Sequence, residues 1–288
     1  MFQQLGLIGC GLMGGSFALA LRQAGLVHRI VGYSKSAQST ARARELGVID
    51  EAAASAADAA AGSDLVLVAV PVAATEATLA AIRESLEAGA LVMDVGSTKQ
   101  DVVEAAQRAL GDRLGAFVPC HPITGKESAG VDHADAGLYQ GRLVVLTPTA
   151  DTPPAQAARA QQVWEAVGGR VRQLEPLAHD TTFAAVSHLP HLLAFAFING
   201  MSGQPDGPDM LAMGGPGFRD FTRIAAGDPQ VWRDILLANR AQVLAQARLF
   251  EQGLAALEKT IEAGDAAGLQ ALIQQASDTR SRWRMGQD

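Results

Sequence analysis

The stretch Gly9-Cys10-Gly11-Leu12-Met13-Gly14 lies between a short apolar run, residues 5–8, and an alanine-rich segment, residues 16–24. The apolar run predicts a buried strand and the alanine-rich segment predicts a helix, so the glycines stand at a strand-to-helix turn. Glycine is needed there for the tight turn, for close approach of the backbone to a pyrophosphate, and for close packing of helix on sheet. The unpaired N–H groups at the helix N-terminus would face the phosphates. This stretch therefore predicts a dinucleotide-binding βαβ unit.

Further short apolar runs follow through the first 174 residues and predict strands. They are residues 30–33, 65–70, 91–95, 116–119, 143–147 and 171–174. Their residues are nearly all apolar instead of alternating with polar ones, as expected for parallel strands covered on both faces. Helix-forming segments such as residues 39–46 separate the early runs. The pattern predicts an α/β fold, with a doubly wound, mostly parallel sheet of the Rossmann type in a dinucleotide-binding domain over residues 1–174.

The composition of the sequence changes after residue 174. No convincing strand follows, and residues 231–257 and 266–277 are rich in Ala, Leu, Gln and Arg, which favour helices. Residues 200–217, half of which are Gly or Pro, predict a loop between helical blocks. The second domain, residues 175–288, is therefore predicted to be all-α and to carry substrate-binding and dimerisation surfaces.

The bulk properties exclude several classes of protein. A length of 288 residues suits two domains, and a net charge of −7 disfavours binding to nucleic acid or to an anionic membrane. The two cysteines, Cys10 and Cys120, are far apart in sequence and are expected to be reduced thiols. No window of 18 uninterrupted apolar residues occurs, and the first strand begins too early for a leader. We therefore expect a soluble cytoplasmic protein without a membrane span.

The end of the second predicted strand bears on the choice of cofactor. A site that prefers NAD usually carries an acid about 20 residues beyond the last glycine of the loop, where the chain has Ser34 followed by Lys35. A hydroxyl beside a cation suits the 2′-phosphate of NADP, so NADP is the preferred cofactor and NAD the alternative. An ordinary polar turn is the other interpretation. The expected cofactor contacts are Gly9, Gly11, Leu12, Met13, Gly14, Ser34, Lys35, Val70 and Pro71.

Three further stretches carry reactive side chains. Gly96-Ser97-Thr98-Lys99 follows the predicted strand 91–95, and His121-Pro122-Ile123-Thr124-Gly125-Lys126-Glu127 follows the predicted strand 116–119. Both begin at the carboxyl ends of strands, where open α/β sheets bind ligands, so they are expected to face the nicotinamide. The third, Ser187-His188-Leu189-Pro190-His191, lies in the first helical block.

Together with Gly217–Ala225, GFRDFTRIA, these motifs resemble the prephenate dehydrogenase family, which includes arogenate and cyclohexadienyl dehydrogenases of tyrosine biosynthesis. The resemblance covers nearly the whole chain and rests on the order and spacing of the motifs. It implies oxidative decarboxylation: a hydride leaves C4 of a cyclohexadienol ring for NAD(P), and carbon dioxide departs as the ring becomes aromatic. The product is 4-hydroxyphenylpyruvate from prephenate or tyrosine from arogenate. No residue identifies which of the two is preferred.

The resemblance also implies roles for individual residues. His121 matches the catalytic histidine, which handles the proton of the 4-hydroxyl, and Ser97 matches a serine that hydrogen-bonds near it. Arg223 matches an arginine whose guanidinium fork binds a substrate carboxylate. The remaining expected substrate-binding residues are His191, Glu127 and Trp232. No metal is expected.

Several residues keep a second interpretation. Trp232 fits the protein core as well as the pocket, and Lys99 could contact the cofactor or cap a helix. His188 is expected to be structural instead of catalytic. His133 and His179 belong to no motif and are expected to face solvent or to be structural.

Two other functions compete with this interpretation. A β-hydroxyacid dehydrogenase begins with a similar glycine loop. Resemblance to that family, however, would imply a catalytic lysine on the first interdomain helix. The chain has no lysine between Lys126 and Lys259. A non-enzymatic dinucleotide-sensing module would keep the glycine loop without a converging set of His, Ser and Arg.

The helical domain carries more apolar positions than one helix face can bury. Leu236, Leu237, Val243, Leu244 and Leu249 are spaced over more than one face of the predicted helix. A second subunit is the expected cover, and a twofold homodimer formed through the C-terminal domain is the default arrangement.

Overall fold

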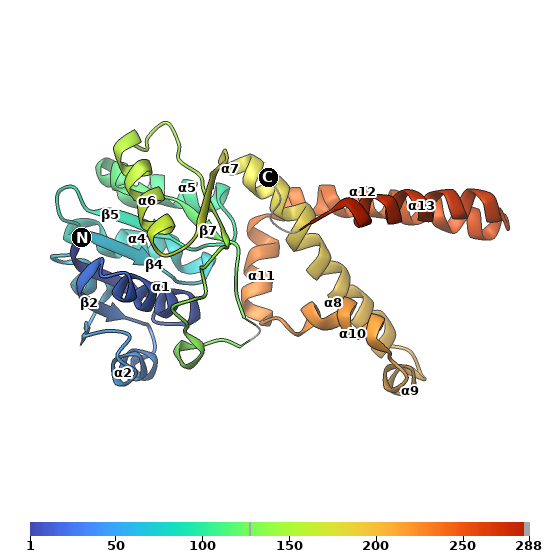
Figure 1. The fold of residues 1–288 in the computed structure, drawn as a ribbon, viewed down its shortest axis with the longest axis horizontal. Helices are drawn as coiled ribbons and strands as arrows, with labels where there is room; N and C mark the ends of the chain where they lie inside the picture. Colours follow the sequence, from blue (N-terminus) through green and yellow to red (C-terminus); the bar gives the residue numbers. More distant parts are fainter. Residues whose placement is uncertain (127, 285–288) are drawn as a thin grey trace.

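The computed structural model describes residues 1–126 and 128–284, which form a layered α/β part and a helical part (Figure 1). The first part is built on a six-stranded sheet with the order β3-β2-β1-β4-β5-β6, in which all neighbouring strands are parallel. Its strands are β1 (Phe2–Ile8), β2 (Val27–Tyr33), β3 (Glu51–Ala52), β4 (Leu65–Val68), β5 (Leu91–Asp94) and β6 (Phe117–Val118). The strand order reverses between β1 and β4, and open α/β sheets bind ligands at the carboxyl ends of strands at such a point.

Helices cover both faces of this sheet, which explains why its strands are apolar throughout. In β4, Leu65 and Leu67 join one core cluster, whereas Val66 and Val68 join another. Successive side chains of a strand point to opposite faces. The helices of this part are α1 (Leu12–Gln23), α2 (Ala37–Glu45), α3 (Ala56–Ala60), α4 (Thr75–Ile82), α5 (Gln100–Leu110) and α6 (Pro154–Ala166). The predicted Rossmann-type fold is confirmed.

A second, smaller sheet holds the strands β7 (Cys120–Pro122), β8 (Leu143–Leu146) and β9 (Arg170–Gln173). Strand β7 runs antiparallel to β8, whereas β8 and β9 are parallel. The predicted strands 143–147 and 171–174 therefore exist but lie outside the main sheet. His121 is likewise part of β7, not of a loop after the preceding strand, because its backbone pairs with Val145.

The helical part begins with α7 (Pro176–Phe183), a π-helical turn (Ala184–His188) and α8 (Leu189–Ser202), which form one continuous run. It continues with α9 (Gly207–Ala212), α10 (Pro216–Thr222), α11 (Pro229–Ala238), α12 (Arg240–Glu262) and α13 (Ala266–Arg282). The expectation of a loop over residues 200–217 is wrong in part, because α9 lies within it. Pro208 and Pro216 occupy first helical turns, where a missing N–H costs no hydrogen bond.

Much of the helical part is apolar and exposed. Within the run Pro176–Ser202, an 18-residue window has a mean hydropathy of 1.4, and 28% of that window is buried. Among the described residues this run alone is long and apolar enough to cross a membrane. Leu237, Leu244 and Leu249 are 64%, 53% and 59% exposed. Val243, by contrast, is buried within the chain itself, so it is not one of the apolar residues that a second subunit would cover. The α12–α13 hairpin projects away from the α/β part (Figure 1).

Candidate active site

The glycine loop between β1 and α1 has the geometry that its sequence predicts. Gly9 has a φ of +103°, and a Cβ on it would lie 2.1 Å from the carbonyl oxygen of Ala69. A Cβ on Gly14 would lie 2.2 Å from the carbonyl oxygen of Gly9. At Gly11, which precedes α1, a Cβ would meet no atom of the described residues within 4 Å. Gly9 and Gly14 thus allow close packing, whereas Gly11 leaves space over a helix N-terminus that fits a pyrophosphate.

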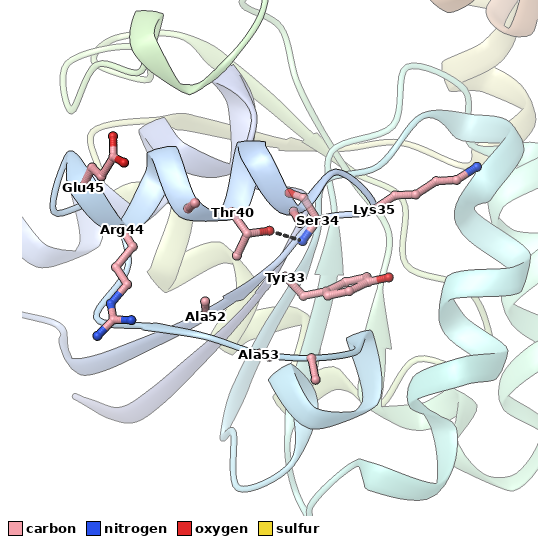
Figure 2. Close-up of a pocket in the computed structure, with 11 residues that line it drawn as sticks. Tyr33, Ser34, Lys35, Thr40, Arg44, Glu45, Ala52 and Ala53 are labelled. Atoms are coloured by element: carbon pink, nitrogen blue, oxygen red, sulfur yellow. Dashed lines mark hydrogen bonds between the residues drawn. The ribbon is translucent and has the colours of Figure 1, made fainter.

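A pocket of about 760 Å³ lies at the carboxyl end of β2 (Figure 2). Ser34, Lys35 and Arg44 line it, and Lys35 and Arg44 extend in different directions from the two sides of Ser34. The Ser34 hydroxyl accepts a hydrogen bond of 2.8 Å from the backbone N–H of Cys10. The backbone N–H of Ser34 donates to the Thr40 hydroxyl at 2.9 Å. Ser34 therefore couples the glycine loop to this pocket.

Sequence analysis did not single out Arg44. The signal for it is helical spacing, since Ala37, Thr40, Ala41 and Arg44 share one face of α2 and all line this pocket. The neighbouring Arg42 instead pairs with Asp132 at 2.6 Å.

A larger cavity of about 970 Å³ lies between the α/β part and the helical part. It brings together ten of the residues expected to bind cofactor or substrate: Gly11, Leu12, Met13, Val70, Pro71, Ser97, His121, His191, Arg223 and Trp232. Gly9 and Gly14 shape the loop behind it. Glu127 lies outside the described residues.

His121 is buried at the wall of this cavity. Its Nδ1 lies 2.8 Å from Nε2 of His179, and Nδ1 of His179 lies 2.8 Å from Oδ1 of Asp180. Burial lowers the pKa of His121 well below its usual value, and the positive charge of Lys99, or a charge on His179 if that ring were protonated, acts in the same direction. The ring of His121 is therefore neutral near pH 7 and can accept a proton.

The contact with His179 was not predicted. His179 is fully buried, so of its two interpretations the solvent-facing one is wrong and the structural one agrees with its position. The sequence holds only a weak signal for it: His179 and Phe183 stand one turn apart in α7, and both rings pack against His121. Ser97 is half-buried and borders the same cavity.

Lys99 occupies the N-cap position of α5, as one of its two interpretations expects, but its side chain makes no capping hydrogen bond and does not line the large cavity. Its side chain is fully buried, forms an ion pair with Asp94 and donates a hydrogen bond of 2.8 Å to the carbonyl oxygen of Cys120. The Asp94 carboxylate also accepts the backbone N–H of Cys120 at 2.8 Å. This buried pair ties the end of β5 to β7, and so fixes the backbone position of His121.

The helical part contributes aromatic and cationic side chains to the cavity. The ring of His191 stacks on Trp232, and its Nδ1 donates to the carbonyl oxygen of Ser187 at 2.9 Å. Burial lowers the pKa of His191, although that hydrogen bond opposes the shift, and the charge of Arg223 adds to the lowering. Trp232 lines the cavity and is partly buried.

His188 also borders the cavity, but its ring contacts Asn239. Its Nδ1 lies 3.1 Å from Nδ2 of Asn239, and burial lowers its pKa to about 4.

Among the described residues, no three His, Cys, Asp or Glu side chains are grouped to hold a metal ion. The cavity thus offers a dinucleotide loop, a neutral histidine, an aromatic surface and a guanidinium. This set suits hydride transfer from an anionic ring substrate that carries a hydroxyl.

Comparison with known families agrees with this chemistry. The family model described as "Prephenate dehydrogenase, nucleotide-binding domain" matches residues 17–173. The model described as "Prephenate dehydrogenase, dimerization domain" matches residues 175–275.

Individual relatives cover nearly the whole chain. Cyclohexadienyl dehydrogenase of Zymomonas mobilis is 34% identical over 92% of this chain and 90% of its own. The crystal structure of Aquifex aeolicus prephenate dehydrogenase in complex with hydroxyphenyl propionate and NAD⁺ has a TM-score of 0.91 and 36% identity, covering 98% of each chain. Arogenate dehydrogenase of Synechocystis has a TM-score of 0.83 and 29% identity, covering 98% of this chain and 100% of its own.

Proposed function

Because this chain belongs to the prephenate dehydrogenase family, we propose that its large cavity oxidises and decarboxylates prephenate or arogenate, with His121 accepting the proton of the ring 4-hydroxyl. The reaction belongs to tyrosine biosynthesis and yields 4-hydroxyphenylpyruvate or tyrosine. One observation carries the residue assignment. The glycine loop, the neutral His121 and Arg223 line one cavity of about 970 Å³, large enough for a nicotinamide and a six-membered ring side by side.

Each of the groups that line the cavity has a separate role in this reaction. A bound nicotinamide dinucleotide supplies the hydride acceptor for the hydrogen on C4 of the ring. The N-terminus of α1 holds the pyrophosphate, and Arg223 binds a substrate carboxylate. The stacked pair of His191 and Trp232 places the ring. Nε2 of His121 takes the hydroxyl proton as the hydride leaves C4, which forms a carbonyl at C4. The bond to carbon dioxide then breaks, its electron pair enters the ring, and the C4 oxygen regains the proton as the ring becomes aromatic.

We propose further that NADP is preferred over NAD. Ser34 and Lys35 line the pocket at the end of β2, and Arg44 adds a second cation to it. None of these three repels a 2′-phosphate, and a guanidinium fork suits phosphate oxygens. Glu45 also lines this pocket, but it lies next to Arg42, which pairs with it at 3.2 Å. NAD is the alternative.

A two-by-two matrix of initial rates tests both proposals. The rates of dinucleotide reduction are measured with prephenate or arogenate, each with NAD or NADP, and carbon dioxide release is followed in parallel. We expect turnover of at least one ring substrate with equal amounts of reduced cofactor and carbon dioxide, and a higher kcat/KM with NADP. Tight dinucleotide binding without turnover of either substrate would instead support a dinucleotide-sensing module. A preference for NAD of tenfold or more would overturn the cofactor proposal alone.

We propose that the protein acts in the cytoplasm as a homodimer formed through its helical part. Leu237, Leu244 and Leu249 are exposed, and the apolar run Pro176–Ser202 is largely uncovered. Burying such surface against a second copy is favourable at about 25 cal/mol per Å² of apolar area. Light scattering should give twice the mass of the chain without detergent. A monomer, or a chain that stays in solution only with detergent, would contradict this.

A further inference from the structure

We propose that His179 and Asp180 fix the tautomer of His121, so that His121 carries its hydrogen on Nδ1 and presents the lone pair of Nε2 to the cavity. His179 is then a positioning residue that acts through His121. The inference rests on the proposed function, in which His121 is the proton acceptor. It starts from the chain of contacts His121–His179–Asp180, two steps of 2.8 Å each, all buried.

The direction of this hydrogen-bond chain follows from its far end. Oδ1 of Asp180 accepts the backbone N–H of Lys99 at 2.8 Å, and Oδ2 accepts the backbone N–H of Gln100 at 2.9 Å. Both amides lie at the start of α5, where the helix dipole favours an anion. An ionised carboxylate accepts hydrogen bonds and donates none. Nδ1 of His179 must therefore carry the hydrogen that it shares with Asp180.

The positions of the other hydrogens in this hydrogen-bond chain then follow. Burial lowers the pKa of His179, so its ring is neutral and has one hydrogen, which is on Nδ1. Its Nε2 can only accept, and the contact with His121 has to be donated by Nδ1 of His121. The neutral ring of His121 has no second hydrogen, which leaves its Nε2 as an acceptor. That is the form a general base needs.

The same hydrogen-bond chain stabilises His121 after it has accepted the proton. The imidazolium of His121 keeps its hydrogen bond to His179, and the carboxylate of Asp180 behind His179 favours the positive charge. Lys99 and His188 also face this group and oppose that charge. Without an acceptor at His179, the two neutral tautomers of His121 would compete, and the Nε2–H form cannot take a proton. In the Ser-His-Asp triad an aspartate bonded directly to the catalytic histidine fixes its tautomer and raises the rate, whereas here His179 stands between the two groups.

Two substitutions of His179 separate this role from packing. His179→Phe keeps an aromatic ring but removes the acceptor, whereas His179→Gln keeps an oxygen that can accept from His121. We expect His179→Phe to lower kcat by about 10² with little change in the KM for cofactor, and His179→Gln to recover much of the loss. The acid limb of kcat/KM should move to lower pH in His179→Phe, because the imidazolium of His121 loses its acceptor. Thr182→Val, on the exposed side of α7, serves as the matched control and should leave kcat unchanged.

A wild-type kcat in His179→Phe would overturn the inference. So would an equal loss in the Phe and Gln variants with an unmoved acid limb, which is the pattern of a packing defect.

A direct reading of the tautomer needs no substitution of His179. The ¹⁵N shifts and long-range couplings of labelled histidines distinguish Nδ1–H from Nε2–H rings, and His121→Asn assigns the His121 signals. At pH 7.5 we expect neutral His121 with its hydrogen on Nδ1, and an Nε2–H ring would overturn the inference even if His179→Phe fails to fold. Failure of the proposed function would appear separately, as absent turnover in the rate matrix of the wild-type protein.

Discussion

The imidazole of His191 stacks on the indole of Trp232, with ring centroids 3.5 Å apart and planes 22° from parallel. This aromatic pair lines the cavity together with the glycine loop and Arg223. Gly227, which also lines the cavity, packs closely against the indole: a Cβ there would lie 2.4 Å from Nε1 and 2.6 Å from Cδ1 of Trp232. The stack therefore depends on a missing side chain at residue 227.

Gly227→Ala should displace the indole of Trp232 and weaken ring binding. Overpacking of this kind costs about 1–3 kcal/mol, and each 1.4 kcal/mol changes affinity about tenfold. We expect the KM for the ring substrate to rise by about tenfold with an unchanged KM for cofactor. Gly217→Ala is the matched control, since a Cβ there meets no described atom within 4 Å. Equal kinetics for the two variants would show that Trp232 does not hold the ring.

Removal of the Arg223 guanidinium should weaken substrate binding. A charge-assisted hydrogen bond contributes about 1.5–3 kcal/mol, and Arg223 is exposed enough for solvent to reduce that value. Arg223→Ala should therefore raise the KM for substrate by about tenfold or more, and Arg223→Lys should recover part of the loss, because lysine keeps the charge without the fork. Initial rates over a range of substrate concentration measure this. An unchanged KM in both variants would place the substrate carboxylate elsewhere.

The pKa of His121 predicts the pH dependence of the reaction. Burial lowers that pKa below the usual 6.5, and only the neutral ring can accept a proton. As pH falls, kcat/KM should stay flat through pH 6.5 and decline only when His121 becomes protonated. A rising limb with its midpoint at or above pH 7 would contradict the assignment of His121 as the base.

The cofactor proposal predicts opposite effects of two substitutions in the pocket at the end of β2. Arg44→Ala should lower kcat/KM with NADP by about tenfold and leave that with NAD unchanged, since only NADP carries a 2′-phosphate. Ser34→Asp should favour NAD, because its carboxylate accepts from the ribose hydroxyls and repels phosphate. Arg83→Ala is the control for Arg44, since Arg83 pairs with Asp112 and neither residue lines this pocket. A loss with both cofactors in Arg44→Ala would indicate a structural role.

The elements that sequence predicts well are those whose pattern is set locally. Strands such as β4 are apolar throughout because both faces of the sheet are covered, and the loop after β1 needs glycine for the positive φ of Gly9 and for the close packing at Gly14. The two strands that were missed, β3 and β7, have two and three residues, and pairing with a neighbour defines them more than composition does.

The missed part of the candidate site depends on tertiary packing. The partner of His121 comes from α7, 58 residues further along the chain, and its orientation depends on Asp180 binding the start of α5. No local spacing relates these groups. The expected residues that border the cavity, by contrast, lie in short motifs at strand ends or on the first helices, and the topology brings such positions together.

The most direct test of the account is the turnover rate of His121→Asn. Asparagine cannot accept the hydroxyl proton at neutral pH, and it leaves the glycine loop and Arg223 in place. We predict that kcat falls by at least ~10², the usual scale for a positioned acid–base group, while the Kd for NADP stays within about twofold. A kcat near that of the wild type would show that His121 is not the base, and the account of this cavity would be wrong.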